Sequence, residues 1–130
     1  KNLILFRGKF SFIIMNLYPY NNGHLMVCPY KHIASLSKLN EETLSEIMKL
    51  ISKSSEILKK TLNAEGFNIG ANIGSVGGAG IDDHLHFHLV PRWKGDTNFM
   101  PVVGNTKVIM SGLHDTYDEL FFHFQKGLAK

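Results

Sequence analysis

Cysteine is almost absent from this 130-residue sequence, and long apolar runs are missing altogether. The one thiol, Cys28, can form neither an internal disulfide nor a cysteine-based zinc cage, which fits a reducing cytoplasm. Because Cys28 ends the apolar run Leu25–Val27, we expect it to be buried. No segment approaches the about 20 apolar residues that a membrane-spanning helix needs, and residues 1–12 lack signal-peptide features. The sequence therefore predicts a cytoplasmic protein that does not act at a membrane.

A strong charge of one sign is also lacking. The formal net charge is +3, and the Lys and Arg residues are scattered instead of forming a stripe. Such a surface attracts phosphate esters mildly but offers no track for nucleic acid, which we do not expect as a partner. Hydrophobic residues make up 44% of the chain, and no repeat or linker is evident, so residues 1–130 predict one globular domain. There is no initiating Met, so an N-terminal segment could be missing.

The pattern of apolar and β-branched residues predicts an α+β fold with about five antiparallel strands. A strong turn signal at Tyr18–Gly23 separates the second strand from the third. The expected strands cover residues 3–7, 10–17, 24–29, 67–73 and 84–90, the last of them stopped by Pro91.

Two helices complete the expected fold. The longer helix is capped at its start by Asn40 and ends at Asn63 or Gly66. After an extended loop over residues 94–110, Ser111 is expected to cap a C-terminal helix. The apolar spacing assigns the buried face of the longer helix to Leu44, Ile47, Met48, Ile51, Leu58 and Leu62.

The last expected strand carries histidine at every second position. Since alternate side chains of a strand point to the same face, His84, His86 and His88 share one face. The opposite face carries Leu85, Phe87 and Leu89 and is apolar enough to join the core. Three imidazoles on an accessible face have no packing role there, which indicates a functional site.

Two other interpretations of this histidine row stay open. A zinc site is one, although neighbouring residues on one face lie about 6.6 Å apart and the outer pair about 13 Å. With Zn–N bonds of about 2.0–2.1 Å, two of the histidines could share a zinc, but three from one flat strand could not. A further ligand would have to come from Asp82, Asp83 or elsewhere. The other interpretation is a cluster without function.

A glycine-rich segment, Gly74–Gly80, precedes the histidines. Glycines let the backbone approach a ligand closely and turn N–H groups toward phosphate oxygens. Imidazole has a reference pKa near 6.5, so a neutral nucleophile is present at physiological pH. We therefore expect the central residue, His86, to attack a nucleotide phosphate and form a covalent phosphoramidate. A P-loop and a clear acidic metal-binding cluster are both lacking, which argues against metal-held phosphoryl transfer.

The segment His84–Trp93 reads HLHFHLVPRW and resembles the signature of the histidine triad (HIT) superfamily. The similarity extends over nearly the whole chain. Asn16, with His24 eight residues later, is similar to the family's ribose-binding position and its supporting histidine, and Asn72–Gly74 to its phosphate-binding segment. The continuation from Pro91 to Pro101 resembles the diadenosine tetraphosphate phosphorylase-like branch.

This resemblance implies a division of roles among the histidines. His86 would be the nucleophile that forms a nucleotidyl-histidine intermediate, and His84 would support it. His88 would contact the phosphate near the scissile bond. His24 would hold the imidazole orientation.

The resemblance also implies a nucleotide site and a homodimer whose sheet continues across the two subunits. Asn16 would bind the ribose, and Asn72 with the loop residues Gly78, Ala79 and Gly80 would bind phosphate. Ile14 shares a face with Asn16, and Met26 shares one with His24, so both could line the base pocket or simply belong to the core. Trp93 could cover the site or anchor its loop on the core.

The sequence departs from the family pattern in three places. No cysteine pair precedes Lys1, so a structural zinc is possible only if a missing N-terminal segment supplies its ligands, and the chemistry requires no cofactor. Ile81 stands where many relatives have Gln, and no hydroxyl residue lies near Gly80, so water and phosphate both stay open as acceptors. The alternative function is a nucleotide-binding regulatory module. The other histidines, His32, His114 and His123, are expected on the surface.

Overall fold

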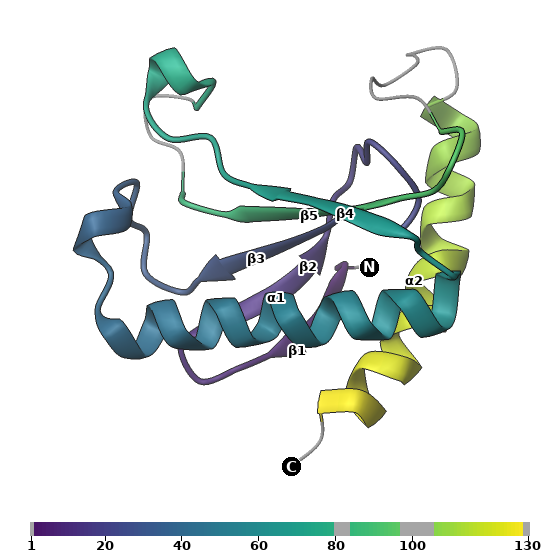
Figure 1. Cartoon of the computed structure of the whole chain (residues 1–130), viewed down its shortest axis with the longest axis horizontal. Coiled ribbons are helices and arrows are strands. Elements are labelled where there is room, and N and C mark those ends of the chain that lie inside the picture. Colours follow the sequence, from purple (N-terminus) through teal and green to yellow (C-terminus); the bar gives the residue numbers. More distant parts are fainter. Residues whose placement is uncertain (1, 80–83, 97–105, 129–130) are drawn as a thin grey trace.

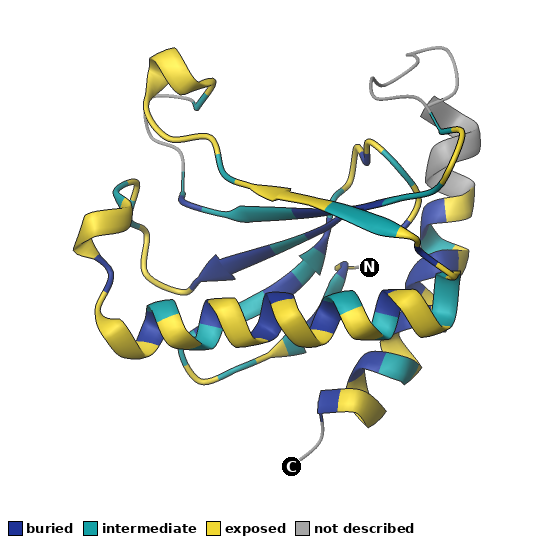
Figure 2. Ribbon diagram, in the orientation of Figure 1, coloured by how far each residue is buried: buried dark blue, intermediate teal, exposed yellow. Residues whose placement is uncertain are grey.

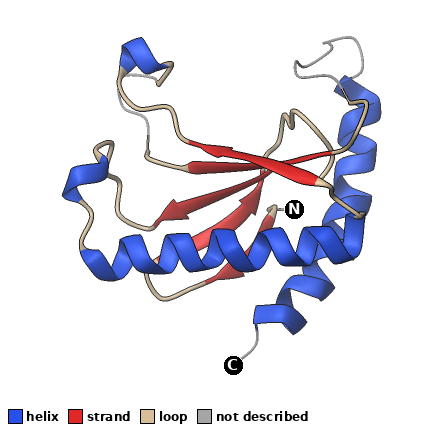
Figure 3. Cartoon of the chain, viewed as in Figure 1, coloured by secondary structure: helices blue, strands red, loops and turns tan. Residues whose placement is uncertain are grey.

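The computed structural model describes residues 2–79, 84–96 and 106–128, which form one five-stranded antiparallel sheet and two long helices. The strands lie in the order β1-β2-β3-β5-β4. Helix α1 crosses one face of the sheet, and α2 packs against β1 and α1 (Figures 1 and 3). The elements are β1 Ile4–Arg7, β2 Ser11–Met15, β3 Leu25–Pro29, α1 Glu41–Leu62, β4 Gly66–Gly70, β5 Phe87–Arg92 and α2 Thr106–Leu128, with short 3-10 turns at Leu36–Lys38 and Ser75–Gly77. This architecture confirms the expected α+β class.

Helix α1 begins and ends as its sequence signals indicate. The Asn40 side chain accepts a hydrogen bond of 2.8 Å from the Thr43 N–H, which satisfies one of the free amides of the first turn. Asn63, with a left-handed φ of 56°, ends the helix, so Asn63 and not Gly66 is the stop. Met48 is 57% exposed, contrary to the expectation, because it lies about 100° around the helix from Ile47. The buried face instead consists of Thr43, Ile47, Leu50, Ile51, Ser54 and Leu58.

Several boundaries differ from the sequence-based expectation, and β5 differs most. It begins at Phe87 and not at His84, and it continues through Pro91 to Arg92. Proline is tolerated there because β3 pairs with β5 only up to Leu89, so at Pro91 only β4 lies alongside.

Strand β4 and helix α2 also begin earlier than expected. Strand β4 covers Gly66–Gly70 instead of residues 67–73. Helix α2 starts at Thr106, which shortens the expected loop and places Ser111 inside the helix. The Ser111-Gly112 pair looks like a helix start because both residues are weak helix formers.

The two faces of the sheet differ in burial. On the face toward the helices, Ile13, Val27, Leu25 and Leu89 are fully buried. On the other face, cross-strand pairs place Ile14 beside Met26 and Met26 beside His88. Figure 2 shows that burial is concentrated in β2 and β3, whereas β4 is largely exposed. Neither of the two long helices, in the part of the chain that the structure describes, is apolar enough to cross a membrane.

Candidate active site

Three histidine rings meet on the open face of the sheet. His88 lies in β5, His86 lies just before that strand, and His24 directly precedes β3. The rings of His86 and His88 meet edge to face with centroids 4.8 Å apart, and the centroids of His24 and His88 are 5.0 Å apart. The fold therefore brings together residues that are more than sixty positions apart in the sequence.

The fourth predicted histidine, His84, lies beside this group and is not part of the β5 ladder. Its Nε2–H donates to the Pro29 carbonyl at 2.6 Å, and its ring meets that of His32 edge to face at 5.1 Å. The Leu85 N–H donates to the Ile33 carbonyl, so the segment before β5 is fixed to the chain that follows β3. The three triad histidines are thus not equivalent members of one flat strand, contrary to the expectation from alternation.

Hydrogen bonds define the tautomers of His24 and His88. The Tyr20 N–H donates to His24 Nδ1 at 3.1 Å, so that nitrogen is an acceptor and the neutral ring carries its proton on Nε2. His24 Nε2 lies 2.8 Å from His88 Nδ1 and donates to it. His88 is in turn left with its proton on Nε2, which is a donor for a ligand.

His86 has the opposite property, a nitrogen lone pair that it can offer. Its Nδ1–H donates to the His84 carbonyl at 2.8 Å, and a carbonyl can only accept. The neutral ring therefore keeps an unprotonated Nε2, which is the nucleophilic form. This bond runs from a side chain to the backbone two residues earlier, and such local bonds compete with strand pairing. That competition explains why β5 starts only at Phe87.

Burial keeps two of the three rings neutral. His24 is fully buried, and this burial, helped by the nearby His88 and His86, lowers the pKa of His24 to about 3. Burial, and secondarily His86, also lowers the pKa of His88. The Tyr20–His24–His88 relay is therefore uncharged at neutral pH, and its proton positions are set by hydrogen bonds.

The predicted nucleoside-side residues lie next to this relay. The Asn16 N–H donates to the His24 carbonyl, and the Asn16 Oδ1 accepts the Tyr18 N–H, which directs the amide NH2 to 3.4 Å from His24 Nε2. Ile14 and Met26 are partly exposed on the face that carries His88. These positions match the sequence-based expectation of a shared face.

The glycine-rich loop differs from the expected phosphate cradle. A 3-10 turn at Ser75–Gly77 closes on itself, since Gly77 and Ala79 donate to the Gly74 carbonyl and Gly78 donates to that of Ser75. These amides are therefore engaged inside the loop and do not point to a ligand in this conformation. A side chain at Gly78 would lie 3.6 Å from the Asn72 side chain, so the loop folds back over Asn72. Gly80, Ile81, Asp82 and Asp83 lie outside the described residues.

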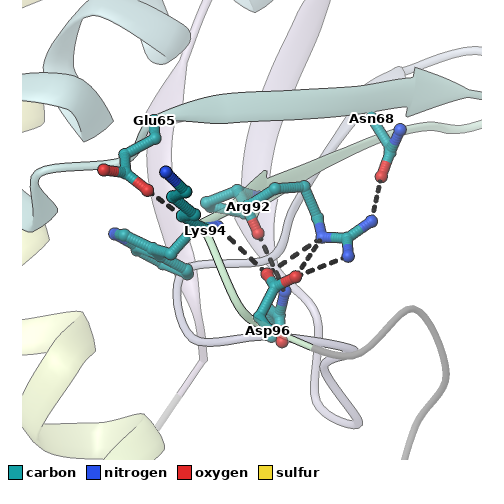
Figure 4. Close-up of polar contacts among 8 residues, drawn as sticks. Glu65, Asn68, Arg92, Lys94 and Asp96 are labelled. Atoms are coloured by element: carbon teal, nitrogen blue, oxygen red, sulfur yellow. Dashed lines mark hydrogen bonds and ion pairs between the residues drawn. The ribbon is translucent and has the colours of Figure 1, made fainter.

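The residues after the triad are held by other parts of the protein. The Trp93 Nε1–H donates to the Leu62 carbonyl at the end of α1, which corresponds to the anchoring alternative for this side chain. Arg92 forms an ion pair with Asp96 and also bonds Asn68 (Figure 4). Its guanidinium is therefore engaged by Asp96 and Asn68.

Four single residues complete the comparison with the sequence. Cys28 is buried as expected, and burial raises the pKa of its thiol to about 12, so it is not a reactive nucleophile. His32 is exposed as expected. His114 and His123 lie in α2 and are partly exposed and partly buried. Within the described ranges, no three His, Cys, Asp or Glu side chains converge in a way that could hold a metal ion.

The sequence did not single out Tyr20, whose N–H bonds His24 Nδ1, or the pair Asn21 and Asp96, whose side chains bond each other. Tyr20 supplies a backbone N–H, and any residue other than proline could do so. Asn21 and Asp96 lie in turns, where polar side chains are ordinary. The only available signal was the strength of the turn at Tyr18–Gly23, directly before a buried histidine.

The open face of the antiparallel sheet thus carries an imidazole whose Nδ1–H is bonded to a carbonyl, His86, beside an imidazole whose Nε2–H can donate, His88. The family model of the HIT domain matches residues 1–95, and the chain belongs to the HIT family. It is 42% identical over 116 residues, 89% of this chain, to a protein of Mycobacterium tuberculosis named AP-4-A phosphorylase. The chain spans 60% of that relative's length.

Other relatives and solved structures agree with this family. The chain is 30% identical over 93 residues, 72% of its length, to the asymmetrical bis(5'-nucleosyl)-tetraphosphatase of Schizosaccharomyces pombe, of which it covers 50%. The fold is similar to that of a zinc-bound histidine triad family protein from Mycobacterium smegmatis, with a TM-score of 0.77 and 20% identity over 97% of this chain and 86% of that one. Because the identity to the M. smegmatis protein is only 20%, this similarity shows a shared fold and nothing more.

Proposed function

We propose that this chain cleaves dinucleoside polyphosphates, such as diadenosine tetraphosphate, through a nucleotidyl intermediate on His86. The observation that carries the proposal is the hydrogen bond from His86 Nδ1–H to the His84 carbonyl, which leaves Nε2 unprotonated beside the His88 donor. The names of the relatives from M. tuberculosis and S. pombe supply the substrate class.

The reaction divides into two displacements at phosphorus. In the first, the His86 Nε2 lone pair forms a P–N bond, and the P–O bond to the rest of the polyphosphate breaks. The His88 Nε2–H donates to a phosphate oxygen and stabilises the charge that develops there. In the second, an acceptor oxygen forms a new P–O bond while the P–N bond breaks, and the Nε2 lone pair returns. The Nδ1–H stays bonded to the His84 carbonyl throughout and stabilises the positive ring of the intermediate.

The nucleotide would lie along the open face of the sheet. Asn16 would bind the ribose through its amide NH2, and Ile14 and Met26 would line the base pocket. Asn72 and the loop residues Gly78, Ala79 and Gly80 would contact phosphate, for which the amides of Gly78 and Ala79 must first open from their present bonds. Trp93 is assigned the anchoring of its loop to α1, which its hydrogen bond supports.

Inorganic phosphate is the acceptor that we propose in the second step. The extended similarity to the M. tuberculosis phosphorylase favours it, although Arg92 is committed to Asp96 and would not help to bind phosphate. Labelled phosphate supplied with diadenosine tetraphosphate tests this assignment. A phosphorylase places the label in released ADP. Unlabelled AMP and ATP, formed at a rate that is indifferent to phosphate, would make the chain a hydrolase.

We further propose a cytoplasmic homodimer that needs no cofactor for its chemistry. Strand β4 is an edge of the sheet, and its residues Asn68–Gly70 are exposed, with Ile69 at 54%. An exposed strand edge is a template for pairing with a second strand. Sedimentation at micromolar concentration should give the mass of two chains, and a monomer would contradict the proposal.

A further inference from the structure

A hydrogen-bonded cluster that the reaction scheme does not use lies at the end of β5. The Arg92 guanidinium bonds both carboxylate oxygens of Asp96, with Nη2 2.5 Å from Oδ1, and its Nη1 donates to Asn68 Oδ1 at 2.6 Å (Figure 4). The Trp93 N–H also donates to Asp96, at 3.0 Å. Because these bonds are charge-assisted and join neighbouring residues, they hold the segment 92–96 in one conformation, and this segment is called the anchor below.

Asn21 connects this anchor to the turn that precedes β3. Its Nδ2 donates to Asp96 Oδ2 at 2.9 Å and to the Pro91 carbonyl at 3.0 Å. Both partners are acceptors, so the position requires a side chain that donates. The connection spans 75 residues of sequence and is not predictable from the turn alone.

The same turn holds both the ring and the backbone of His24, through Tyr20 and Asn21. The Tyr20 N–H donates to His24 Nδ1, and the His24 N–H donates to the Asn21 carbonyl, each at 3.1 Å. The Tyr20 ring stacks on that of His24, with an interplanar angle of 12°. A shift of this turn would remove the donor that keeps His24 Nδ1 an acceptor, and the proton could then move from Nε2.

We infer that Asn21, held by Asp96, is a positioning residue for the histidine relay: it fixes the turn so that His24 and His88 both keep their protons on Nε2. With His24 Nε2–H bonded to His88 Nδ1, His88 presents its own Nε2–H to the substrate. The inference rests on the proposed function for its effect on catalysis. Its effect on the two tautomers does not depend on any substrate.

The test compares two identical substitutions at one cluster, Asn21→Asp and Asn68→Asp. At residue 21 the carboxylate faces two acceptors and repels them, whereas at residue 68 it keeps the acceptor that Arg92 Nη1 needs. We expect Asn21→Asp to lower kcat for diadenosine tetraphosphate by about tenfold or more with little change in KM, because the reacting groups lose their alignment. Asn68→Asp should stay within about twofold of the wild type in both parameters, since its hydrogen bond is retained.

The tautomers are read separately by long-range proton–nitrogen NMR on protein labelled with 15N-histidine. The wild type and Asn68→Asp should show His24 and His88 protonated only at Nε2, and Asn21→Asp should lose this pattern at His24. If the wild type shows no cleavage, the proposed function fails, and the NMR comparison still decides the positioning role. An unchanged tautomer pattern in Asn21→Asp overturns the inference whatever happens to kcat, and so does an equal loss in Asn68→Asp. If Asn21→Asp does not fold, Asn21→Ala is tested by the same criteria. If neither variant folds, Asn21 is required for folding, and the inference is overturned.

Discussion

Two hydrogen-bond networks in this small protein differ in whether they leave a donor for a ligand. At the hairpin between β1 and β2, the Glu46 carboxylate from α1 accepts from the N–H groups of Lys9 and Phe10 and from the hydroxyl of buried Ser11. At the other site, the chain of bonds runs from Tyr20 through His24 to His88 and leaves His88 Nε2–H for a ligand. The first network is closed, and the second is open.

The difference teaches which polar cluster serves folding and which serves chemistry. In the closed network every donor points to one carboxylate, and even Gly8 is constrained, since a Cβ there would lie 2.8 Å from Glu46 Oε1. Burial alone would raise the pKa of Glu46, but the bonds from Ser11, Phe10 and Lys9 outweigh it and lower that pKa. In the open network, burial lowers the pKa of both His24 and His88 and so favours their neutral rings.

Removing the proposed nucleophile His86, whose ring contacts His88 at the open end, should have the largest effect. His86→Ala should lower kcat by at least about a thousandfold, because a nucleophile acts mainly in the transition state. AMP should bind nearly as tightly as to the wild type, since His86 contributes little to ground-state binding. Product release measured by chromatography and AMP binding measured by calorimetry check the two parts. Turnover equal to that of the wild type would exclude His86 as the nucleophile.

Acid should act next most strongly, through the buried middle of the relay. The pKa of His24 is lowered to about 3 in the folded protein, whereas unfolded histidine titrates near 6.5, so the unfolded state binds more protons between these values. The stabilisation from neutral His24 is present above pH 6.5 and is lost as the pH falls toward 3, by about 2 kcal/mol at pH 5.

Urea unfolding of the wild type and His24→Gln at pH 7 and pH 5 measures the contribution of His24 to the free energy of unfolding. The wild type should lose more free energy of unfolding than the variant over this interval. His32→Gln, at an exposed histidine, should behave as the wild type does. Equal losses in the wild type and His24→Gln would show that His24 is not the buried neutral group.

The closed network should affect stability and leave catalysis unchanged. Glu46→Gln replaces an acceptor by an amide that opposes one of the hairpin donors, which should cost about 1–2 kcal/mol in the free energy of unfolding. The matched control is Glu56→Gln on the same helix, where the exposed pair with Lys59 should contribute less than about 1 kcal/mol. A fall in kcat for Glu46→Gln at a temperature where it is folded would contradict the separation of the two networks.

Metal removal should have the smallest effect. Hydrogen bonds to protein atoms already occupy His24 Nδ1, His84 Nε2 and His86 Nδ1, so these nitrogens do not converge on an ion. We expect turnover to remain within about twofold after treatment with a chelator, because the proposed nucleophile is an imidazole and not a metal-bound water. Loss of activity that added zinc restores would contradict this expectation.

Local signals in the sequence predicted much of the fold and only part of the site. Asn40 and Asn63 bound α1 because capping depends on a few neighbouring residues. Strand alternation predicted that Met26 shares a face with His24, and both lie next to His88. The start of β5 was wrong because the His86 side chain takes the His84 carbonyl, a competition that the two-residue period does not reveal. The pairing of Arg92 with Asp96 was not predicted, because the two side chains meet through a turn.

Long-range bonds explain the remaining differences between sequence and structure. The relay depends on the pairing of β3 with β5, which brings His24 to His88 across 64 residues. A resemblance to a family implied that His24 supports the triad, but the tautomer that it imposes follows only from the Tyr20 N–H. The proton positions of the site are therefore a property of the tertiary structure.

The stereochemistry at phosphorus tests the central claim, two displacements on His86, most directly. Each in-line displacement inverts the configuration, so a substrate with a chiral phosphorothioate at the attacked position, turned over with an isotopically labelled acceptor, reports how many displacements occur. We predict retention of configuration in the nucleotide product, because the P–N bond to His86 is formed and then broken. Inversion would mean that the acceptor attacks the substrate directly, and it would contradict the covalent mechanism.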